Sequence, residues 1–243
     1  FGLKTEKLYE ILDLIAYYFP ECEGINMDAT VTSILHKSQE ELEMLARKKV
    51  KHLYLGIESG LDDVLKFMKK DHDLAQAYQA IDRLHEAGLI YDAHIMTGVA
   101  GKGRGMENAE ALAQFLNRTN PAHVVNFSMF LHKEVPLYQD IRQGTFVPAD
   151  ELETIREEYH LIERIAPEKA GANILYDGFH DFIHVRVRGH LPGDKEKMLA
   201  KLNGIIQEYE GKEPVYSFVQ GECPDLEYCD DGKAVWDMDR KTS

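Results

Sequence analysis

The residues with the clearest chemical potential stand at positions 56–60, where the sequence runs Gly-Ile-Glu-Ser-Gly. A carboxylate beside a hydroxyl and a flexible glycine can accept hydrogen bonds from the two hydroxyls of a ribose. A purely structural alternative is open as well: Ser59 caps the following helix with Asp62 as its partner, and Glu58 pairs with a nearby cation. Local chemistry therefore leaves a nucleoside contact and a helix cap as two interpretations.

Two further segments carry charge in a regular arrangement. Residues 101–105 run Gly-Lys-Gly-Arg-Gly before a predicted helix, so their amides could hold a phosphate, although no Gly-Lys-Ser/Thr follows and a solvated loop is the alternative. His184, Arg186, Arg188 and His190 occupy alternate positions, and in a strand they would share one cationic face. That face would suit an acidic substrate, with an ordinary exposed polar face as the alternative.

The cysteines and histidines do not form a metal-binding pattern. Cys223 and Cys229 are widely spaced and have no second pair, and Cys22 stands alone near the other end of the chain. Three such thiols cannot supply the clustered thiolates of an iron–sulfur centre, and an odd count argues against a disulfide framework. His180 and His184 have the spacing of helical metal ligands, but the surrounding residues lack helical periodicity.

The elements that must position these residues alternate between strand and helix. Apolar, partly β-favouring runs are centred near Ile25, Leu53, Ile95 and Val125, and amphipathic helical patterns separate them. Such alternation predicts a parallel sheet with helices outside and its chemistry at the carboxyl ends of the strands. The candidate site therefore combines residues 58–60, 97–98 and 128–132.

Helix boundaries and the later part of the chain are also predicted. Ser38 with Glu41 forms a capping box, Asp73 caps another helix, and Gly88 ends it in a left-handed conformation. Helices are expected over residues 106–117, around 152–162 and over 195–209. Residues 173–189 are expected to be irregular or β-like.

Composition excludes several classes of protein. Of the 243 residues, 44% are hydrophobic, which indicates a globular chain with a sizeable core. The net charge of −14 disfavours a general nucleic-acid binder. No apolar run is long enough to span a membrane and no secretory leader opens the chain, so a cytoplasmic location is expected.

Several of these segments together resemble the radical S-adenosylmethionine (SAM) superfamily. The similarity is to the branch of oxygen-independent coproporphyrinogen III oxidase-like Fe–S oxidoreductases. The segments that carry it are residues 53–60 with Asp63-Val64-Leu65 and Met68, residues 85–88, residues 93–98 with Gly101, residues 135–138 (Val-Pro-Leu-Tyr, where the family has Gly-Thr-Pro-Leu-Tyr), and residues 189–199.

The resemblance implies an α/β fold: a partial (β/α)6 TIM-like barrel, truncated at the N-terminus, with a C-terminal α/β extension. Residues 1–145 would form strands 3–6 of the barrel, residues 146–211 a C-terminal helical extension and residues 212–243 an acidic tail. A 4Fe–4S cluster would cleave SAM to a 5′-deoxyadenosyl radical, with electrons from flavodoxin or ferredoxin, for hydrogen abstraction from an unknown small-molecule substrate.

The resemblance also assigns residues. Glu58 would bind the SAM ribose with Ser59 beside it, Gly98 would allow the adenosyl group to approach closely, and Ser128 would line the adenine side. The cationic face described above, and not the resemblance, makes Arg186 and Arg188 the candidate substrate-binding residues.

One departure from the family is large. The CxxxCxxC cluster motif, the first strand and the glycine-rich end of the second strand are absent. We expect the cluster ligands upstream of Phe1 and expect the chain as given to be inactive. The alternatives are a cluster-less, non-catalytic binding module of the same fold and a metabolic barrel enzyme that holds phosphate at residues 101–105.

Overall fold

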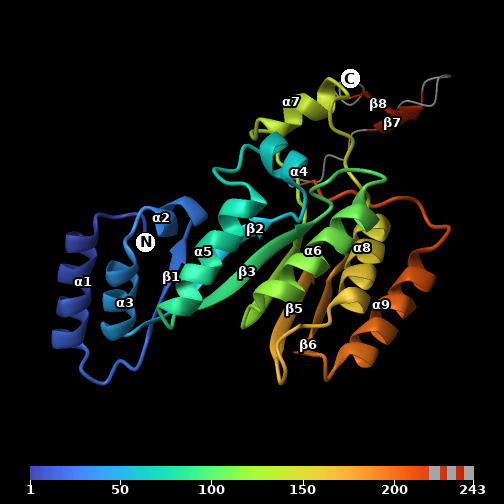
Figure 1. Ribbon diagram of the computed structural model, residues 1–243. Helices are drawn as coiled ribbons and strands as arrows, with labels where there is room; N and C mark the ends of the chain where they lie inside the picture. The colour runs from blue at the N-terminus through green and yellow to red at the C-terminus, as the bar shows by residue number, and fades with distance from the viewer. Residues whose placement is uncertain (219–224, 229–233, 238–243) are drawn as a thin grey trace.

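The computed structural model describes residues 1–218, 225–228 and 234–237. Its centre is a six-stranded sheet whose strands neighbour one another in chain order, as Figure 1 shows. The first five strands are mutually parallel and the sixth is antiparallel to the fifth. The outer strands β1 and β6 are not paired with each other, so the sheet is open. The strands are β1 (Ile25–Ala29), β2 (Val50–Glu58), β3 (Ile90–Thr97), β4 (His123–Ser128), β5 (Ile174–His180) and β6 (Val185–Leu191).

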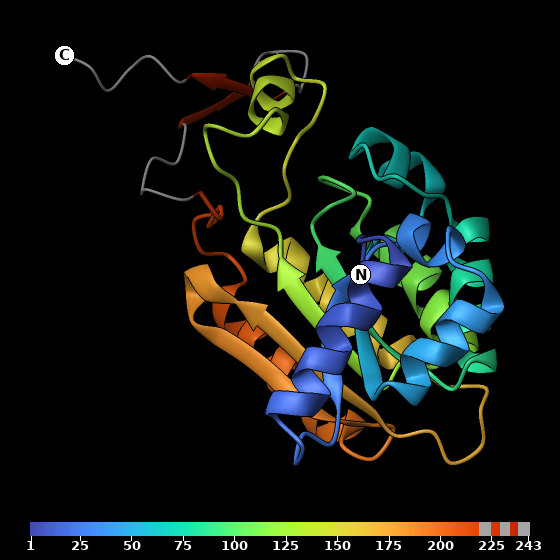
Figure 2. The ribbon, with the colours of Figure 1, turned by 90° about the vertical axis from the view of Figure 1, so that its left-hand side faces the viewer.

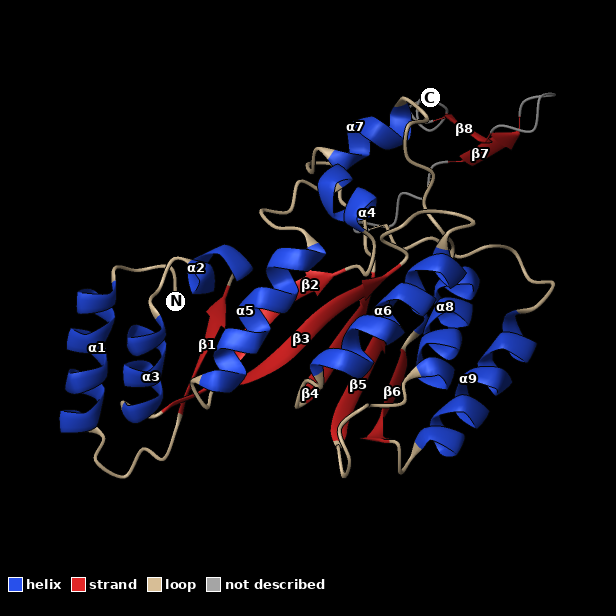
Figure 3. Cartoon of the chain, viewed as in Figure 1, coloured by secondary structure: helices blue, strands red, loops and turns tan. Residues whose placement is uncertain are grey.

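Helices cover one face of this sheet. Helices α5, α6, α8 and α9 lie on the same side, and α1 lies beside α3 beyond β1 (Figures 1 and 3). We call the opposite side of the sheet the open face (Figure 2). The helices are α1 (Thr5–Tyr18), α2 (Val31–Leu35), α3 (Gln39–Arg47), α4 (Asp62–Phe67), α5 (Leu74–Glu86), α6 (Gly105–Thr119), α7 (Leu137–Arg142), α8 (Glu151–Arg164) and α9 (Lys195–Tyr209), with a 3-10 turn, η1, at Asp181–Ile183.

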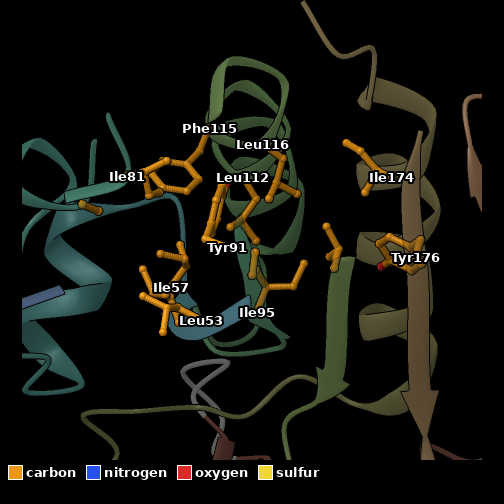
Figure 4. Close-up of a cluster of buried hydrophobic side chains, with 14 of the residues drawn as sticks. Leu53, Ile57, Ile81, Tyr91, Ile95, Leu112, Phe115, Leu116, Ile174 and Tyr176 are labelled. Atoms are coloured by element: carbon orange, nitrogen blue, oxygen red, sulfur yellow. The ribbon is translucent and has the colours of Figure 1, made fainter. Parts of the chain in front are cut away.

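The core forms because side chains along each strand point alternately to the two faces of the sheet. In β2, Leu53, Leu55 and Ile57 are fully buried against the helices, whereas Tyr54 and Gly56 point to the open face. Figure 4 shows the helical side of this contact, where Ile81, Leu112, Phe115 and Leu116 meet Leu53, Ile57, Tyr91 and Ile95. Burying one such side chain contributes about 1.5–3 kcal/mol, so the core fixes which face of each strand remains available for binding.

The predicted caps are confirmed. The Ser38 side chain accepts from the Glu41 N–H, and the Glu41 carboxylate accepts from the Ser38 N–H. Asp73 caps α5, and Gly88 follows that helix with φ of 75°. Helix α9 has the predicted bounds, and strand β3 (Ile90–Thr97) contains the apolar run predicted near Ile95. The short helices α2 and α7 were not predicted, because five or six residues are too few to show a periodic pattern.

The segment after residue 173 extends the sheet. Strand β5 pairs in parallel with β4, with Val124 opposite Tyr176, and β6 returns beside it as a hairpin. The sheet therefore continues past residue 145, into the segment that we expected to be a separate C-terminal extension. The division of the chain into domains stays a prediction. In the tail, β7 (Asp225–Tyr228) pairs with β8 (Ala234–Asp237). Cys223 and Cys229 lie outside the described residues. Among the described helices, none has the length and apolarity needed to cross a bilayer.

Candidate functional site

The carboxyl ends of the parallel strands meet at one edge of the sheet. Strand β2 ends at Glu58, β3 at Thr97 and β4 at Ser128, so the three predicted segments are brought together. Thr97 and Ser128 are direct cross-strand partners. Figure 3 places α4 and α7 beyond this edge. This is the edge at which open parallel sheets bind ligands.

Glu58 presents its carboxylate on the open face. The side chain continues the alternation of Tyr54 and Gly56, although a register shift between Gly56 and Glu58 and a φ of 61° make the backbone irregular here. A Cβ on Gly56 would lie 2.5 Å from Glu58 Oε1 and 3.1 Å from Lys70 Nζ, so both charged groups lie above Gly56. The Lys70 ammonium donates to Glu58 Oε1 over 3.1 Å, and the Glu58 side chain remains 24% exposed. A left-handed non-glycine residue of this kind is a frequent feature of binding sites.

Gly98 begins the loop after β3, at a position where both the backbone conformation and the neighbouring atoms require glycine. Its φ is 83°, and a Cβ there would lie 2.8 Å from Thr154 Cγ2 on α8. Its N–H donates to Glu157 Oε2 over 2.8 Å. The space that the missing Cβ leaves is therefore filled from within the protein by α8.

Ser59 and Ser128 are not where we expected them. Both hydroxyls face the helices rather than the open face, since Ser59 donates to Asn108 over 2.6 Å and Ser128 donates to Glu151 over 3.0 Å. Ser59 is fully buried and does not cap α4, whose N-terminal cap position is Leu61. The physical reason is strand alternation, which turns neighbouring side chains to opposite faces. The two serines hold the strand ends in place, and of these three side chains only that of Glu58 lies on the open face.

A chain of hydrogen bonds connects the two loops from behind. Asn108 on α6 accepts from the Ser59 hydroxyl and from the Gly60 N–H, the latter over 3.3 Å. Its amide group donates to Glu157 Oε1 over 2.7 Å. Because Glu157 also accepts from Gly98, one buried carboxylate joins the loop after β2 to the loop after β3.

A second buried cluster lies under β4 and β5. His180 is enclosed between two carboxylates of α8, with Nδ1 at 2.9 Å from Glu151 and Nε2 at 3.0 Å from Glu158. Burial by itself lowers the pKa of His180, but the hydrogen bonds and negative charges of these glutamates outweigh it and raise the pKa to about 9. Burial opposes ionisation of Glu151 too, yet His180 and two serine hydroxyls hold its pKa below the ordinary value. The imidazolium is therefore the counter-ion of both carboxylates at neutral pH.

Sequence reasoning did not identify these α8 carboxylates. Glu151, Glu157 and Glu158 are 1%, 0% and 0% exposed, although α8 is otherwise a normal amphipathic helix. A signal was present, because Glu151 and Glu158 fall on the same helical stripe as the apolar Ile155 and Ile162. Acidic residues inside an apolar stripe indicate a buried polar network.

The cationic face predicted for β6 exists, and it lies on the open face. Arg186 and Arg188 both approach Asp177 of β5, at 2.6 Å and 3.7 Å. The two guanidinium groups stay more than half exposed while Asp177 is 6% exposed. His184 is not part of this face, since it occupies a left-handed turn before the strand. Two cations share one carboxylate, which leaves a surplus positive charge at this side of the sheet.

Aromatic rings cross the open face between Glu58 and these arginines. Tyr54 stacks on His94 with ring centroids 5.6 Å apart, and Phe127 stacks on Phe179 at the same spacing. His94 meets Phe127 edge-on at 6.3 Å, and the Arg186 guanidinium lies 4.7 Å from the Phe179 ring centre. The rings are half-buried, so the open face offers a continuous aromatic surface.

The glycine-rich loop does not present a free anion site. The Gly103 N–H donates to the Glu153 carboxylate, and the Lys102 N–H donates to the Val147 carbonyl over 2.8 Å. The Arg104 guanidinium is held by Asp63 and Glu107. A carboxylate of the protein itself already occupies the position a phosphate would need, which argues against the phosphate-binding alternative.

Comparison with known proteins identifies the N-terminal part of the chain. Residues 3–116 match the radical SAM superfamily. This segment belongs to that superfamily. It contains β1, β2 and β3 with Glu58 and Gly98, so the predicted relationship is confirmed at the level of the superfamily.

One curated relative and one solved structure, both from the same archaeon, are similar to this chain. The tRNA uridine(34) acetyltransferase of Methanocaldococcus infernus is 25% identical over 119 residues, which are 49% of this chain and 22% of that protein. The structure of Elp3 from the same archaeon, lacking residues 1–46, superposes with a TM-score of 0.56 at 17% identity, over 77% of this chain and 42% of that one. The likeness to Elp3 confirms the predicted partial-barrel fold. The chain thus spans well under half the length of these relatives.

Two other solved structures show weaker similarity. Methylornithine synthase (PylB) has a TM-score of 0.49 at 15% identity, over 83% of this chain and 63% of that one. Coproporphyrinogen III oxidase (HemN) from Escherichia coli has a TM-score of 0.44 at 13% identity, over 76% of this chain and 49% of that one.

The superfamily generally uses two groups, SAM and a 4Fe–4S cluster. The radical SAM segment has a side chain that suits the first of them. Glu58 offers an accessible carboxylate on the open face, which suits the ribose of SAM. The iron–sulfur cluster has no such fit among the described residues. No group of three or more metal-ligating side chains occurs there, and Cys22 is the one cysteine among them.

Proposed function

We propose that this chain supplies the SAM-binding and substrate-facing part of a radical SAM enzyme that cleaves SAM reductively and abstracts hydrogen from a small-molecule substrate. The observation that carries the proposal is the Glu58 carboxylate, presented on the open face at the carboxyl end of β2 within the radical SAM segment. A ribose diol offers two donors to the two carboxylate oxygens. Lys70 keeps one oxygen paired in the absence of ligand.

The cluster and its electron donor belong to the proposal as partners of this part. Cluster ligands would have to come from outside the described residues, because no three or more metal-ligating side chains gather among them. The electron donor would be a flavodoxin or a ferredoxin. The similarity to coproporphyrinogen oxidase-like enzymes rests on the motifs at residues 135–138 and 189–199 and names a branch, not a substrate.

The open face favours an acidic substrate with a flat apolar part. Arg186 and Arg188 share the single carboxylate of Asp177, so a ligand carboxylate would complete their charge balance. The aromatic surface that begins at Phe179 next to Arg186 would hold the flat part by stacking. Both features lie on the same side of the sheet as Glu58.

RNA is the competing substrate class, because one relative is named as a tRNA uridine(34) acetyltransferase. The net charge of −14 opposes it, since affinity for RNA depends on neutralising phosphates. A gel-shift titration with tRNA at low salt separates the two. Binding at low micromolar concentration would favour the RNA alternative.

The test of the Glu58 assignment uses 5′-deoxyadenosine, which keeps the ribose diol and does not need the cluster to bind. We expect Glu58→Ala to weaken its affinity at least about tenfold in calorimetry, because a charge-assisted hydrogen bond contributes about 1.5–3 kcal/mol. Glu43→Ala is the matched control, as Glu43 also pairs with a single cation, Arg47, on the surface of α3.

A ligand lacking one hydroxyl sharpens this test. With 2′,5′-dideoxyadenosine the parent should already have lost one bond to Glu58, so the Glu58→Ala effect should shrink. Equal affinity of Glu58→Ala and parent for 5′-deoxyadenosine would show that the ribose assignment is wrong.

A further inference from the structure

The loops that carry Glu58 and Gly98 share one anchor, the buried carboxylate of Glu157. Its Oε2 accepts from the Gly98 N–H over 2.8 Å, and its Oε1 accepts from the Asn108 amide over 2.7 Å. Asn108 in turn binds Ser59 and Gly60, the two residues that follow Glu58. Glu157 is fully buried.

Hydrogen-bond polarity favours the ionised form of this carboxylate. A backbone N–H such as that of Gly98 can only donate. Asn108 cannot turn its oxygen toward Glu157, because Oδ1 already accepts from the Gly60 N–H and from the Ser59 hydroxyl. Both neighbours of Glu157 within the described residues therefore donate. A proton on either carboxyl oxygen would make that oxygen a weaker acceptor and would weaken the hydrogen bond that holds one of the loops.

The surroundings oppose that ionisation. Burial raises the pKa of Glu157 to about 7, against the hydrogen bonds of Asn108 and Gly98. Glu153, one turn away on α8, raises the pKa further, and the His180 charge from β5 lowers it. Tyr176 on β5 also faces Glu157 electrostatically, and from α6 the facing group is the neutral Asn108.

We propose that Glu157 is a positioning residue whose ionised form holds the loops after β2 and β3 in the geometry that binds the adenosyl group, so that nucleoside affinity falls when this carboxylate takes up a proton. This inference rests on the proposed function, because the ligand is the one assigned to Glu58. Glu157 acts through Asn108 and the Gly98 amide.

The first measurement follows the Gly98 amide by NMR without ligand. An amide that donates to a carboxylate changes its chemical shift when the carboxylate takes up a proton. We expect the Gly98 signal to titrate with a midpoint near pH 7 in the parent and in Glu163→Gln, a control at an exposed position of the same helix. In Glu157→Gln this titration should be absent. An unchanged titration in Glu157→Gln would overturn the assignment.

The second measurement is the affinity for 5′-deoxyadenosine at pH 6 and pH 8. If only the ionised form binds, a group titrating near 7 is about a tenth ionised at pH 6 and about nine-tenths ionised at pH 8. Affinity should then differ about tenfold between the two. In Glu157→Gln the affinity should be weak and independent of pH, whereas Glu163→Gln should follow the parent.

A second variant covers the case in which Glu157→Gln does not fold. Asn108→Asp keeps the bonds to Ser59 and Gly60 but places a second carboxyl group against Glu157, so the two groups must share a proton. The Gly98 midpoint should move above 7 and the affinity at pH 8 should fall.

The outcomes separate the two claims. A Gly98 signal that titrates while nucleoside affinity stays constant with pH overturns the positioning role and leaves the proposed function intact. A Gly98 signal that titrates in a parent that does not bind the nucleoside at either pH overturns the proposed function itself.

Discussion

Raising the pH from 6.5 to above 9 should remove a large part of the stability that His180 provides. The imidazole lies between Glu151 and Glu158, and its pKa in the folded protein is about 9, against 6.5 in an unfolded chain. A group whose pKa is raised by folding stabilises fully below the unfolded value. That contribution is lost as the pH rises through the folded value.

The size of the effect follows from the shift. Each pKa unit corresponds to 1.36 kcal/mol, so deprotonation of His180 should lower the free energy of unfolding by about 3 kcal/mol between pH 6.5 and 9.5. Domains of this kind have about 5–15 kcal/mol in total, so the loss is easily measured. Physically, a neutral imidazole leaves two buried carboxylates without a counter-ion.

The assay is urea unfolding followed by circular dichroism at several pH values. His180→Gln should be less stable than the parent at pH 6.5 by about 3–5 kcal/mol, because one partner of a buried ion cluster has been removed. The difference should narrow as the pH rises to 9.5. His36→Gln, a substitution at an exposed histidine, is the control and should show the pH dependence of the parent.

Direct titration of the His180 ring by NMR can refute this reasoning. A midpoint of the His180 titration at or below pH 6.5 would mean that burial outweighs the effect of the two glutamates. The assignment of a buried imidazolium at neutral pH would then be wrong. The same conclusion would follow if parent and His180→Gln kept a constant stability difference over the whole pH range.

Three further experiments test other parts of the structure. Gly98→Ala should lower the free energy of unfolding by at least about 1–2 kcal/mol, because φ is 83° and the new Cβ would lie 2.8 Å from Thr154 Cγ2; adding Thr154→Ser should recover only the steric part in urea unfolding. Ser38→Ala should cost about 1 kcal/mol by removing the cap of α3, measured in the same way. Replacing both Arg186 and Arg188 by alanine should leave the 5′-deoxyadenosine affinity unchanged and weaken the binding of anilinonaphthalene sulfonate, an anionic aromatic probe, in a fluorescence titration; an unchanged probe affinity would argue against the acidic-substrate proposal.

Much of the fold could be predicted because it depends on short-range chemistry. The apolar run of β3, the periodic face of α9 and the capping boxes at Ser38 and Asp73 are local patterns, and the structure reproduces them. The position of Glu58 at the carboxyl end of a parallel strand follows from the same patterns. These features need only neighbouring residues to be known.

Strand pairing and side-chain direction needed the tertiary structure. Nothing local indicates that β5 pairs with β4, because residues 124 and 176 are distant in the sequence. Pairing and register then decide that Ser59 and Ser128 face the helices while Arg186 faces the open side.

The sequence by itself thus determined most of the longer elements, the superfamily motifs and the place of Glu58. Only the tertiary structure decided that α8 brings Glu151, Glu157 and Glu158 beneath the strand ends. The physical reason is that a buried charge is tolerated only where partners from other elements satisfy it, and those partners are Asn108 of α6 and His180 of β5.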